Sequence, residues 1–264
     1  MKSALLYILL CCILINIIDS TMSRRPFLAQ LNLLNFFVFA PMNVGTYFGT
    51  PSWLRKELWD NGGVIRNPSQ RHFPNIEKLR EAFSIIKKEA RNCMVASKPI
   101  KDDMYFTGIA DDGWKRFYIK WYGPSDKLAK QICPETCALL DTMPEVHLAM
   151  FSILMPYSRI KPHFGPARMC LRYHIGISTP NDDKCFIELG GKTKYSWRDG
   201  EDVMFDDTLP HYVYNNTNTP RIILFLDVER PQQNGILKKF TQSQIKYIAP
   251  MTTRSNNKQE KAEK

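Results

Sequence analysis

The chain has 264 residues, of which 44% are hydrophobic, and this composition excludes a wholly disordered protein and favours one domain with a substantial core. Its formal net charge of +10 favours anionic partners such as acidic lipid headgroups or acidic substrates, with a lysine-rich solvated surface as the alternative. No basic run with interleaved aromatic residues occurs, so we expect no nucleic acid partner.

The N-terminus carries two apolar stretches. Residues 4–18 are almost wholly apolar, but a helix of that length covers about 22 Å, short of a hydrocarbon core of about 30 Å. A second stretch, residues 27–40, is interrupted by three polar residues. We predict that residues 1–40 form a single N-terminal membrane anchor with an interfacial part; a cleaved signal peptide and a buried hairpin are the alternatives. Arg24 and Arg25 after the first stretch favour a cytoplasmic catalytic domain.

The next part of the chain, residues 41–140, is predicted to be the α/β N-terminal part of the catalytic domain. Apolar residues recur at three- and four-residue spacing over 76–91, which predicts a helix that supports a sheet. Asn75, just after a proline, is a suitable N-cap. A second helix is predicted over 125–140.

From about residue 104 the pattern becomes that of strands. Residues 104–123 alternate around an Asp-Asp-Gly turn, which predicts a hairpin. After residue 145, short apolar runs alternate with breaks rich in turn residues, one of them at 156–162. The predicted strands are VHLAMFSIL, MCLRYHIGI, KCFIEL, KYSW, DVMFD, HYVY and RIILFLDV. This spacing predicts a mainly β fold, an antiparallel sandwich or jelly roll, over 141–235. The polar, basic tail over 236–264 is predicted to be disordered.

Seven cysteines are present, and two of them lie in the apolar N-terminus. The other five contain a single C-x3-C pair, Cys133 and Cys137, which is too few ligands for a zinc site. We expect reduced, mostly buried thiols in a domain that faces a reducing compartment.

Two histidines are candidate metal ligands. His163 lies in a break between predicted strands, and His211 begins a predicted strand. In a jelly roll, strands that are distant in sequence become neighbours, so the two imidazoles can meet at one open end. Two imidazoles suit Fe(II), but the usual carboxylate two residues after the first histidine is replaced by Gly165. The alternative is that His163 caps a loop and His211 is a surface residue.

Two arginines stand out in the same region. Arg221 opens an apolar strand, where it is either a solvated edge charge or a fork-shaped anchor for a carboxylate. Arg172 and His174 share one face of a strand by period-two alternation, opposite apolar residues. That face is therefore either solvent-exposed or the wall of a polar cavity.

Several blocks in this order resemble the aspartyl/asparaginyl β-hydroxylase family of Fe(II)/2-oxoglutarate dioxygenases, and most closely its bacterial lipid A 2-hydroxylase branch. The blocks are FAPMNVGTYF, WKRFYIKWYG, HFGP, LRYHIGI, YSWRDGE and RIILFLDVERP, within residues 38–232. The resemblance implies a double-stranded β-helix (jelly roll, cupin-like) that holds one Fe(II). In this alignment His163 and His211 match the iron ligands, and Arg221 matches the arginine that pairs with the distal carboxylate of 2-oxoglutarate.

Three further residues match cosubstrate contacts of the family. Arg172 and His174 match its R-x-H pair, and Ser152 matches a serine that helps to hold 2-oxoglutarate. Gly165 departs from the H-x-D motif of the lipid branch, whereas animal aspartyl hydroxylases also have glycine there. Asp206 and Asp207 are either an alternative source of a carboxylate or structural residues of the turn before His211.

The resemblance implies an oxidoreductase that uses Fe(II), 2-oxoglutarate and O2 to hydroxylate an unactivated C–H bond. The substrate is either an Asp or Asn side chain of a polypeptide or an acyl chain of a membrane lipid. The anchor and the positive charge favour the lipid, and Gly165 favours the polypeptide. The alternative is a non-catalytic jelly-roll binding module that has lost its metal, which the missing carboxylate motivates.

Overall fold

The computed structural model describes residues 43–100, 109, 112–165 and 168–232, together with residues 235, 238, 239, 242, 245 and 256. The predicted anchor, the first strand of the predicted hairpin and most of the predicted disordered tail lie outside the described residues. Within the described part of the chain, no helix is both long enough and apolar enough to span a membrane.

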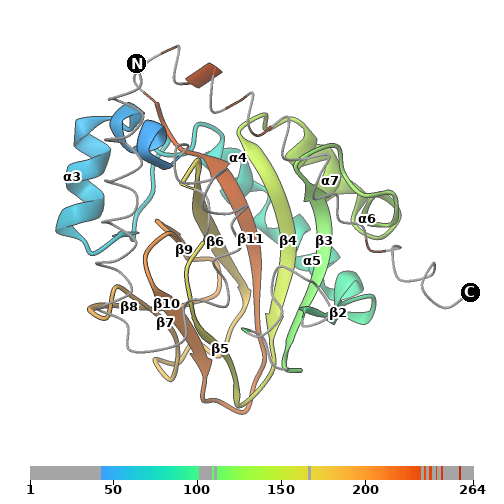
Figure 1. The fold of residues 1–264 in the computed structure, drawn as a ribbon. Coiled ribbons are helices and arrows are strands. Elements are labelled where there is room, and N and C mark those ends of the chain that lie inside the picture. The colour runs from blue at the N-terminus through green and yellow to red at the C-terminus, as the bar shows by residue number, and fades with distance from the viewer. Residues whose placement is uncertain are drawn as a thin grey trace, which may run out of the picture.

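The described strands form two antiparallel sheets that pack face to face (Figure 1). The seven-stranded sheet has the order β1-β9-β6-β11-β4-β3-β2, and the four-stranded sheet has the order β5-β10-β7-β8. The bounds are β1 (Val64–Ile65), β2 (Lys98–Pro99), β3 (Trp114–Trp121), β4 (Val146–Leu154), β5 (Ser158–His163), β6 (Cys170–Ser178), β7 (Cys185–Leu189), β8 (Thr193–Ser196), β9 (Asp202–Phe205), β10 (His211–Asn215) and β11 (Arg221–Glu229).

The strand order is that of a jelly roll. From β4 to β11 the chain passes repeatedly between the sheets, so that β9, β6, β11 and β4 face β5, β10, β7 and β8. The predicted mainly β, antiparallel fold is confirmed, and all seven strands predicted after residue 145 are present.

The prediction of a break over residues 156–162 is wrong, because β5 occupies most of this segment. β5 is an edge strand of the four-stranded sheet, and Ile160 is its only buried residue. Without an apolar alternation, and with Pro162 inside it, the segment has no strand signature; proline is tolerated at a sheet edge because no ladder bond is lost there. His163 is therefore the last residue of a strand and does not lie in a loop.

Helices cover the outer face of the seven-stranded sheet (Figure 1). They are α3 (Ser52–Asp60), α4 (Ile76–Glu81), α5 (Phe83–Val95), α6 (Lys127–Ile132) and α7 (Pro134–Asp141). Each predicted long helix is divided into two, at Ala82 and at Cys133, where Pro134 starts α7. Asn75 does precede α4, but its side chain donates to Glu145 Oε1 at 2.8 Å instead of capping the helix.

Two cores result from this three-layer arrangement. One lies between the helices and the seven-stranded sheet, and the other lies between the sheets. β11 is apolar almost throughout because Leu224 and Leu226 face the first core while Ile223 and Phe225 face the second. The face of β6 that carries Arg172 and His174 therefore points into the space between the sheets, not into solvent.

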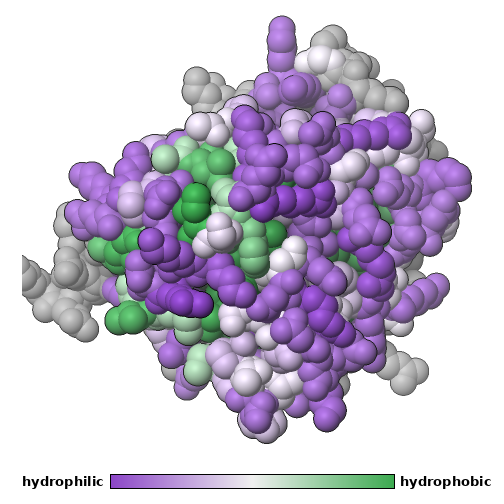
Figure 2. All heavy atoms as spheres, turned by 180° about the vertical axis from the view of Figure 1, so that it is seen from behind, coloured by the Kyte–Doolittle hydropathy of each residue, from purple (hydrophilic) through white to green (hydrophobic). Residues whose placement is uncertain are grey.

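The outer surface is mainly hydrophilic. Figure 2 shows the face opposite to that of Figure 1, where polar side chains surround a limited apolar area. The five cysteines in the described part of the chain are all free and buried. Asn256 is also buried, and its side-chain amide bonds both the N–H and the C=O of Tyr118 on β3, at 3.0 and 2.8 Å.

Candidate active site

The two histidines lie side by side on neighbouring strands. His163 closes β5 and His211 opens β10, and the two residues are direct partners in the antiparallel ladder. Their ring centroids are 4.2 Å apart. His211 is buried and His163 is partly exposed. The jelly-roll topology thus brings together two side chains that are 48 positions apart in the sequence.

Both imidazoles are held in the form that binds a metal. His163 Nδ1 lies 2.8 Å from the Lys161 carbonyl, and His211 Nδ1 lies 2.8 Å from the Leu209 carbonyl. Since a carbonyl can only accept, each Nδ1 is assigned the proton, and each Nε2 keeps a lone pair. Desolvation, with His211 as a neighbour, lowers the pKa of His163 to about 3, and desolvation lowers the pKa of His211 to about 4. Both rings are neutral at neutral pH.

A carboxylate approaches the position at which the sequence lacks one. A Cβ atom at Gly165 would collide with the carboxylate of Asp207, and the Gly165 N–H donates to the Asp207 carbonyl at 2.6 Å. Asp206 points elsewhere, because its carboxylate pairs with Arg230 at 2.8 Å and accepts from Thr208. Of the two candidate carboxylates, the structure therefore brings only Asp207 to Gly165.

Arg172 is held between two acids. Its guanidinium pairs with Asp207 and with Asp227, each at 2.5 Å, and it lies over the ring of Phe225 at 4.0 Å. Burial opposes the charge on Arg172, but the two carboxylates raise its pKa. Tyr122 donates to the second Asp227 oxygen at 2.8 Å, which fixes that carboxylate in turn.

Arg221 is a buried cation that has no counter-ion within the described part of the chain. The side chain is 1% exposed, and no carboxylate of the described residues pairs with it. Its Nη2 donates to Ser152 Oγ at 3.1 Å, its Nε has no partner among the described residues, and its guanidinium lies 4.6 Å from the Trp197 ring centroid. Burial lowers its pKa to about 10, so the group stays charged at neutral pH.

The hydroxyl proton of Ser152 has no acceptor among the described residues. Its oxygen accepts from Arg221 and also from Trp114 Nε1 at 2.9 Å. A hydroxyl has two acceptor lone pairs and one proton, so both acceptor positions are used and only the O–H can still bond. Together with Arg221 Nε and Trp197 Nε1, this makes a set of hydrogen-bond donors for which the described residues supply no acceptor.

His174 lies between Arg221 and the pair His163 and His211, in a chain of ring contacts. It is 5% exposed, and neither ring nitrogen has a hydrogen-bond partner among the described residues. Its ring lies 4.9 Å from Phe205 and 5.9 Å from Trp197; Phe205 in turn lies 6.2 Å from His211. Burial, and then the nearby Arg221, lowers the pKa of His174 well below its usual value. All six predicted site residues therefore face one region between the sheets.

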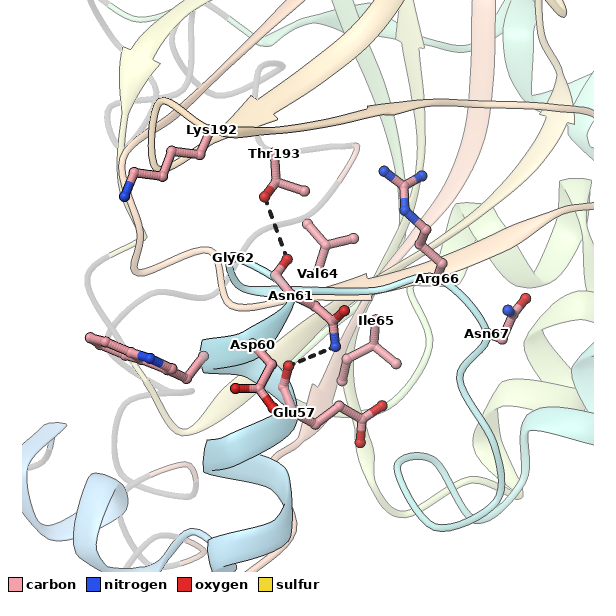
Figure 3. Close-up of a pocket in the computed structure, with 11 residues that line it drawn as sticks. Glu57, Asp60, Asn61, Gly62, Val64, Ile65, Arg66, Asn67, Lys192 and Thr193 are labelled. Atoms are coloured by element: carbon pink, nitrogen blue, oxygen red, sulfur yellow. Dashed lines mark hydrogen bonds between the residues drawn. The ribbon is translucent and has the colours of Figure 1, made fainter.

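The donor set fits Fe(II) with two protein ligands. Neutral imidazoles are good ligands for this ion, and each His163 and His211 ring has a free Nε2. The described residues contain no group of three or more His, Cys, Asp or Glu side chains arranged to hold a metal. A pocket of about 660 Å³ lies elsewhere, between the end of α3 and the β7–β8 turn, and Figure 3 shows that Glu57, Asn61 and Thr193 line it with none of the six site residues.

The sequence pattern alone did not identify three residues of this region: Trp114, Trp197 and Asp227. Each lies in a stretch that reads as an ordinary strand or turn. Asp227 had a usable signal, because it interrupts the apolar run of β11; in the structure it lies in register with Arg172. The tryptophans have none, since burial of an indole is the common case.

The chain is similar in sequence to several known proteins. The profile described as aspartyl/asparaginyl beta-hydroxylase matches residues 80–231, which is more than half of the chain. An ornithine lipid ester-linked acyl 2-hydroxylase from Rhizobium tropici is 33% identical over 122 residues, which cover 46% of this chain and 43% of that protein. The human aspartyl/asparaginyl beta-hydroxylase is 32% identical over 124 residues, which cover 45% of this chain and 16% of that protein.

Among solved structures, a prolyl-4-hydroxylase from Pseudomonas putida aligns with 66% of this chain and 96% of its own, at 14% identity and a TM-score of 0.43. The fold assignment therefore rests on the strand order described above. The aligned part spans less than half the length of the first curated relatives. From the extent of the profile match, the chain belongs to the aspartyl/asparaginyl beta-hydroxylase family.

Proposed function

We propose that this protein is an Fe(II)- and 2-oxoglutarate-dependent hydroxylase whose site is built from His163, His211 and Arg221. The observation that carries the proposal is the buried guanidinium of Arg221, which pairs with no carboxylate of the described residues and donates to the Ser152 hydroxyl. A buried charge is costly unless it is paired, so this site favours the binding of an anion. A dicarboxylate can bind Arg221 with one carboxylate and lie at the two histidines with the other.

The side chains divide the work of binding and orientation. His163 and His211 would hold the iron, and Arg221 and Ser152 would take the distal carboxylate of 2-oxoglutarate through charge-assisted hydrogen bonds. Arg172 and His174 would contact the end of the cosubstrate near the metal. Bound iron supplies the activation of O2, and the overall reaction gives hydroxylated product, succinate and carbon dioxide. The aromatic walls, Phe205 and Phe225, exclude water.

The experiment uses the full chain, purified anaerobically in detergent. Fe(II) and then 2-oxoglutarate are added, and the visible charge-transfer band of the chelated keto acid is titrated. We expect a band that is lost in His163→Ala and His211→Ala. In Arg221→Ala the apparent Kd for 2-oxoglutarate should rise about 10- to 100-fold, the equivalent of about 1.5–3 kcal/mol for a charged hydrogen bond.

The matched control is Arg198→Ala, because this arginine pairs with the exposed Asp183 at the surface. Its titration should equal that of the parent protein. If the parent protein shows no band and retains no iron, the hydroxylase proposal fails, and the non-catalytic binding module is the better reading.

The substrate is proposed from the relatives. One relative is named for an acyl chain of ornithine lipid and another for Asp and Asn side chains. Mass spectrometry of lipid extracts and of Asp- and Asn-containing peptides after incubation distinguishes the two. A gain of one oxygen atom in an acyl chain supports the lipid reading, and the same gain in a peptide supports the polypeptide reading.

The organisation of the chain is also a proposal. We infer an N-terminal membrane anchor over 1–40, an α/β part over 41–140, a jelly-roll core over 141–235 and a basic tail over 236–264. Support comes from the apolar N-terminal sequence, the charge of +10 and the relative named for a lipid substrate. A cytoplasmic position of the catalytic domain follows from Arg24 and Arg25 after the first apolar stretch.

A further inference from the structure

A short helix at the start of the described chain exposes two aromatic side chains. Residues 43–49 are helical, and within them Tyr47 is 46% exposed and Phe48 is 68% exposed. The two rings contact each other edge to face, with centroids 5.6 Å apart. Exposure of two adjacent aromatic side chains to water is unfavourable relative to their burial, so this pair is a candidate contact surface.

Two arginines accompany the pair. The guanidinium of Arg55 lies 5.4 Å from the Tyr47 ring centroid, and that of Arg168 lies 5.6 Å from it. Aromatic rings together with arginines are the composition found at the headgroup level of a bilayer, where the ring is partly buried and the cation meets phosphate. The overall charge of +10 has the sign that anionic lipids attract.

The helix borders the segments that carry both histidines. The backbone N–H of Arg168 donates to Asn43 Oδ1 at 2.7 Å, and Arg168 follows His163 by five residues. The Arg168 guanidinium donates to Thr208 Oγ1 at 3.1 Å, and Thr208 precedes His211 by three residues. Arg168 therefore connects the helix that carries the aromatic pair to the segment before His211.

The helix follows closely after the second apolar stretch of the N-terminus. The apolar stretch over residues 27–40 ends three residues before Asn43. Three residues span at most about 11 Å when fully extended. If a bilayer binds the end of this apolar stretch, Tyr47 and Phe48 are therefore close enough to contact the same bilayer.

We propose that Tyr47 and Phe48, with Arg55 and Arg168, dock on an anionic lipid bilayer and hold the segments that carry His163 and His211 near it. The substrate is then the acyl chain of a membrane lipid, taken from the bilayer surface and not from solution. The substrate part of this inference rests on the proposed hydroxylase function; the docking part stands without it.

The test places a reporter in the bilayer surface. Full-length Phe48→Trp is reconstituted into phosphatidylcholine–phosphatidylglycerol vesicles with brominated acyl chains, which quench tryptophan on contact. We expect loss of most of the emission that the new indole adds over the parent protein. The matched control is Tyr157→Trp, because Tyr157 is 75% exposed and lies on the β4–β5 turn. Its added emission should persist. Unquenched emission at position 48, or equal quenching at both positions, overturns the docking surface.

A second variant separates docking from the chemistry. Tyr47→Ser/Phe48→Ser should keep the charge-transfer band with 2-oxoglutarate but lose about tenfold or more of its hydroxylation of vesicle lipid, because less apolar area is buried at the interface. Unchanged lipid hydroxylation overturns the inference. Quenching at position 48 without any band in the parent protein would instead support docking and reject the proposed hydroxylase.

Discussion

Gly165 shows how one residue decides the shape of the candidate site. The space into which a side chain would project is filled by the Asp207 carboxylate, which Arg172 holds in place. We therefore predict that Gly165→Asp, which restores the carboxylate at this position, lowers the free energy of unfolding by about 1–3 kcal/mol through overpacking and like-charge contact. Chemical denaturation measures this effect.

Two variants make the comparison specific. Gly165→Asp with Asp207→Ala should recover part of the loss, because the occupant of the space is removed. Gly45→Ala is the control, since a Cβ atom at Gly45 meets nothing within 4 Å. Full stability of Gly165→Asp would show that the Asp207 side chain leaves this space easily.

At the scale of elements, the side-chain amide of Asn215 joins the end of β10 to the end of β4 by hydrogen bonds. Asn215 is fully buried, and its Nδ2 donates to the carbonyls of Leu154, Met155 and Thr219 at 3.1, 3.1 and 2.8 Å. Asn215→Ala leaves these buried acceptors without this donor, so the free energy of unfolding should fall by about 2–3 kcal/mol. The exposed neighbour, Asn216→Ala, should change it by less than about 0.5 kcal/mol.

The same element explains why the N-x-T sequence at Asn215 does not mark a surface sugar in the folded protein. Its Oδ1 accepts from Thr217 Oγ1 at 2.6 Å, so the amide is used at both ends. If Asn215→Ala were as stable as Asn216→Ala, the amide network would be of no consequence for the joint between the two sheets.

At the scale of the whole molecule, buried neutral histidines make stability depend on pH. The pKa of His211 is lowered to about 4 by desolvation, whereas in an unfolded chain it is about 6.5. Between these values the unfolded state binds more protons, so the free energy of unfolding falls as the pH drops from about 6.5 toward 4. Above about 6.5 the group has no effect, because it is neutral in both states.

The prediction concerns metal-free protein. The difference in unfolding free energy between about pH 7 and about pH 5 should be smaller in His211→Gln than in the parent protein, by about 1–2 kcal/mol. Urea denaturation in the presence of a chelator at the two pH values measures it. Equal pH dependence of the two proteins would mean that the imidazole of His211 is not protected from protons in the folded state.

Much of the fold could be predicted from the sequence because it depends on local patterns. Strands with two buried faces are apolar throughout, and turn residues mark where they end, so seven strands after residue 145 were found with bounds close to those observed. β5 was missed because an edge strand buries little and needs no apolar alternation. The two predicted helices lie where α4–α5 and α6–α7 are found, but their breaks at Ala82 and Cys133 were not predicted, since helical periodicity continues across a short interruption. α3 was not predicted.

The sequence by itself determined the kind of fold, the membership of the family and the residues proposed for the site, since these depend on residue types and their order along the chain. Only the tertiary structure decided that His163 faces His211, that no described carboxylate pairs with Arg221 and that Asp207 fills the space beside Gly165. These are contacts between strands that are far apart in sequence. Their geometry follows from sheet register and packing between the sheets, which no local pattern records.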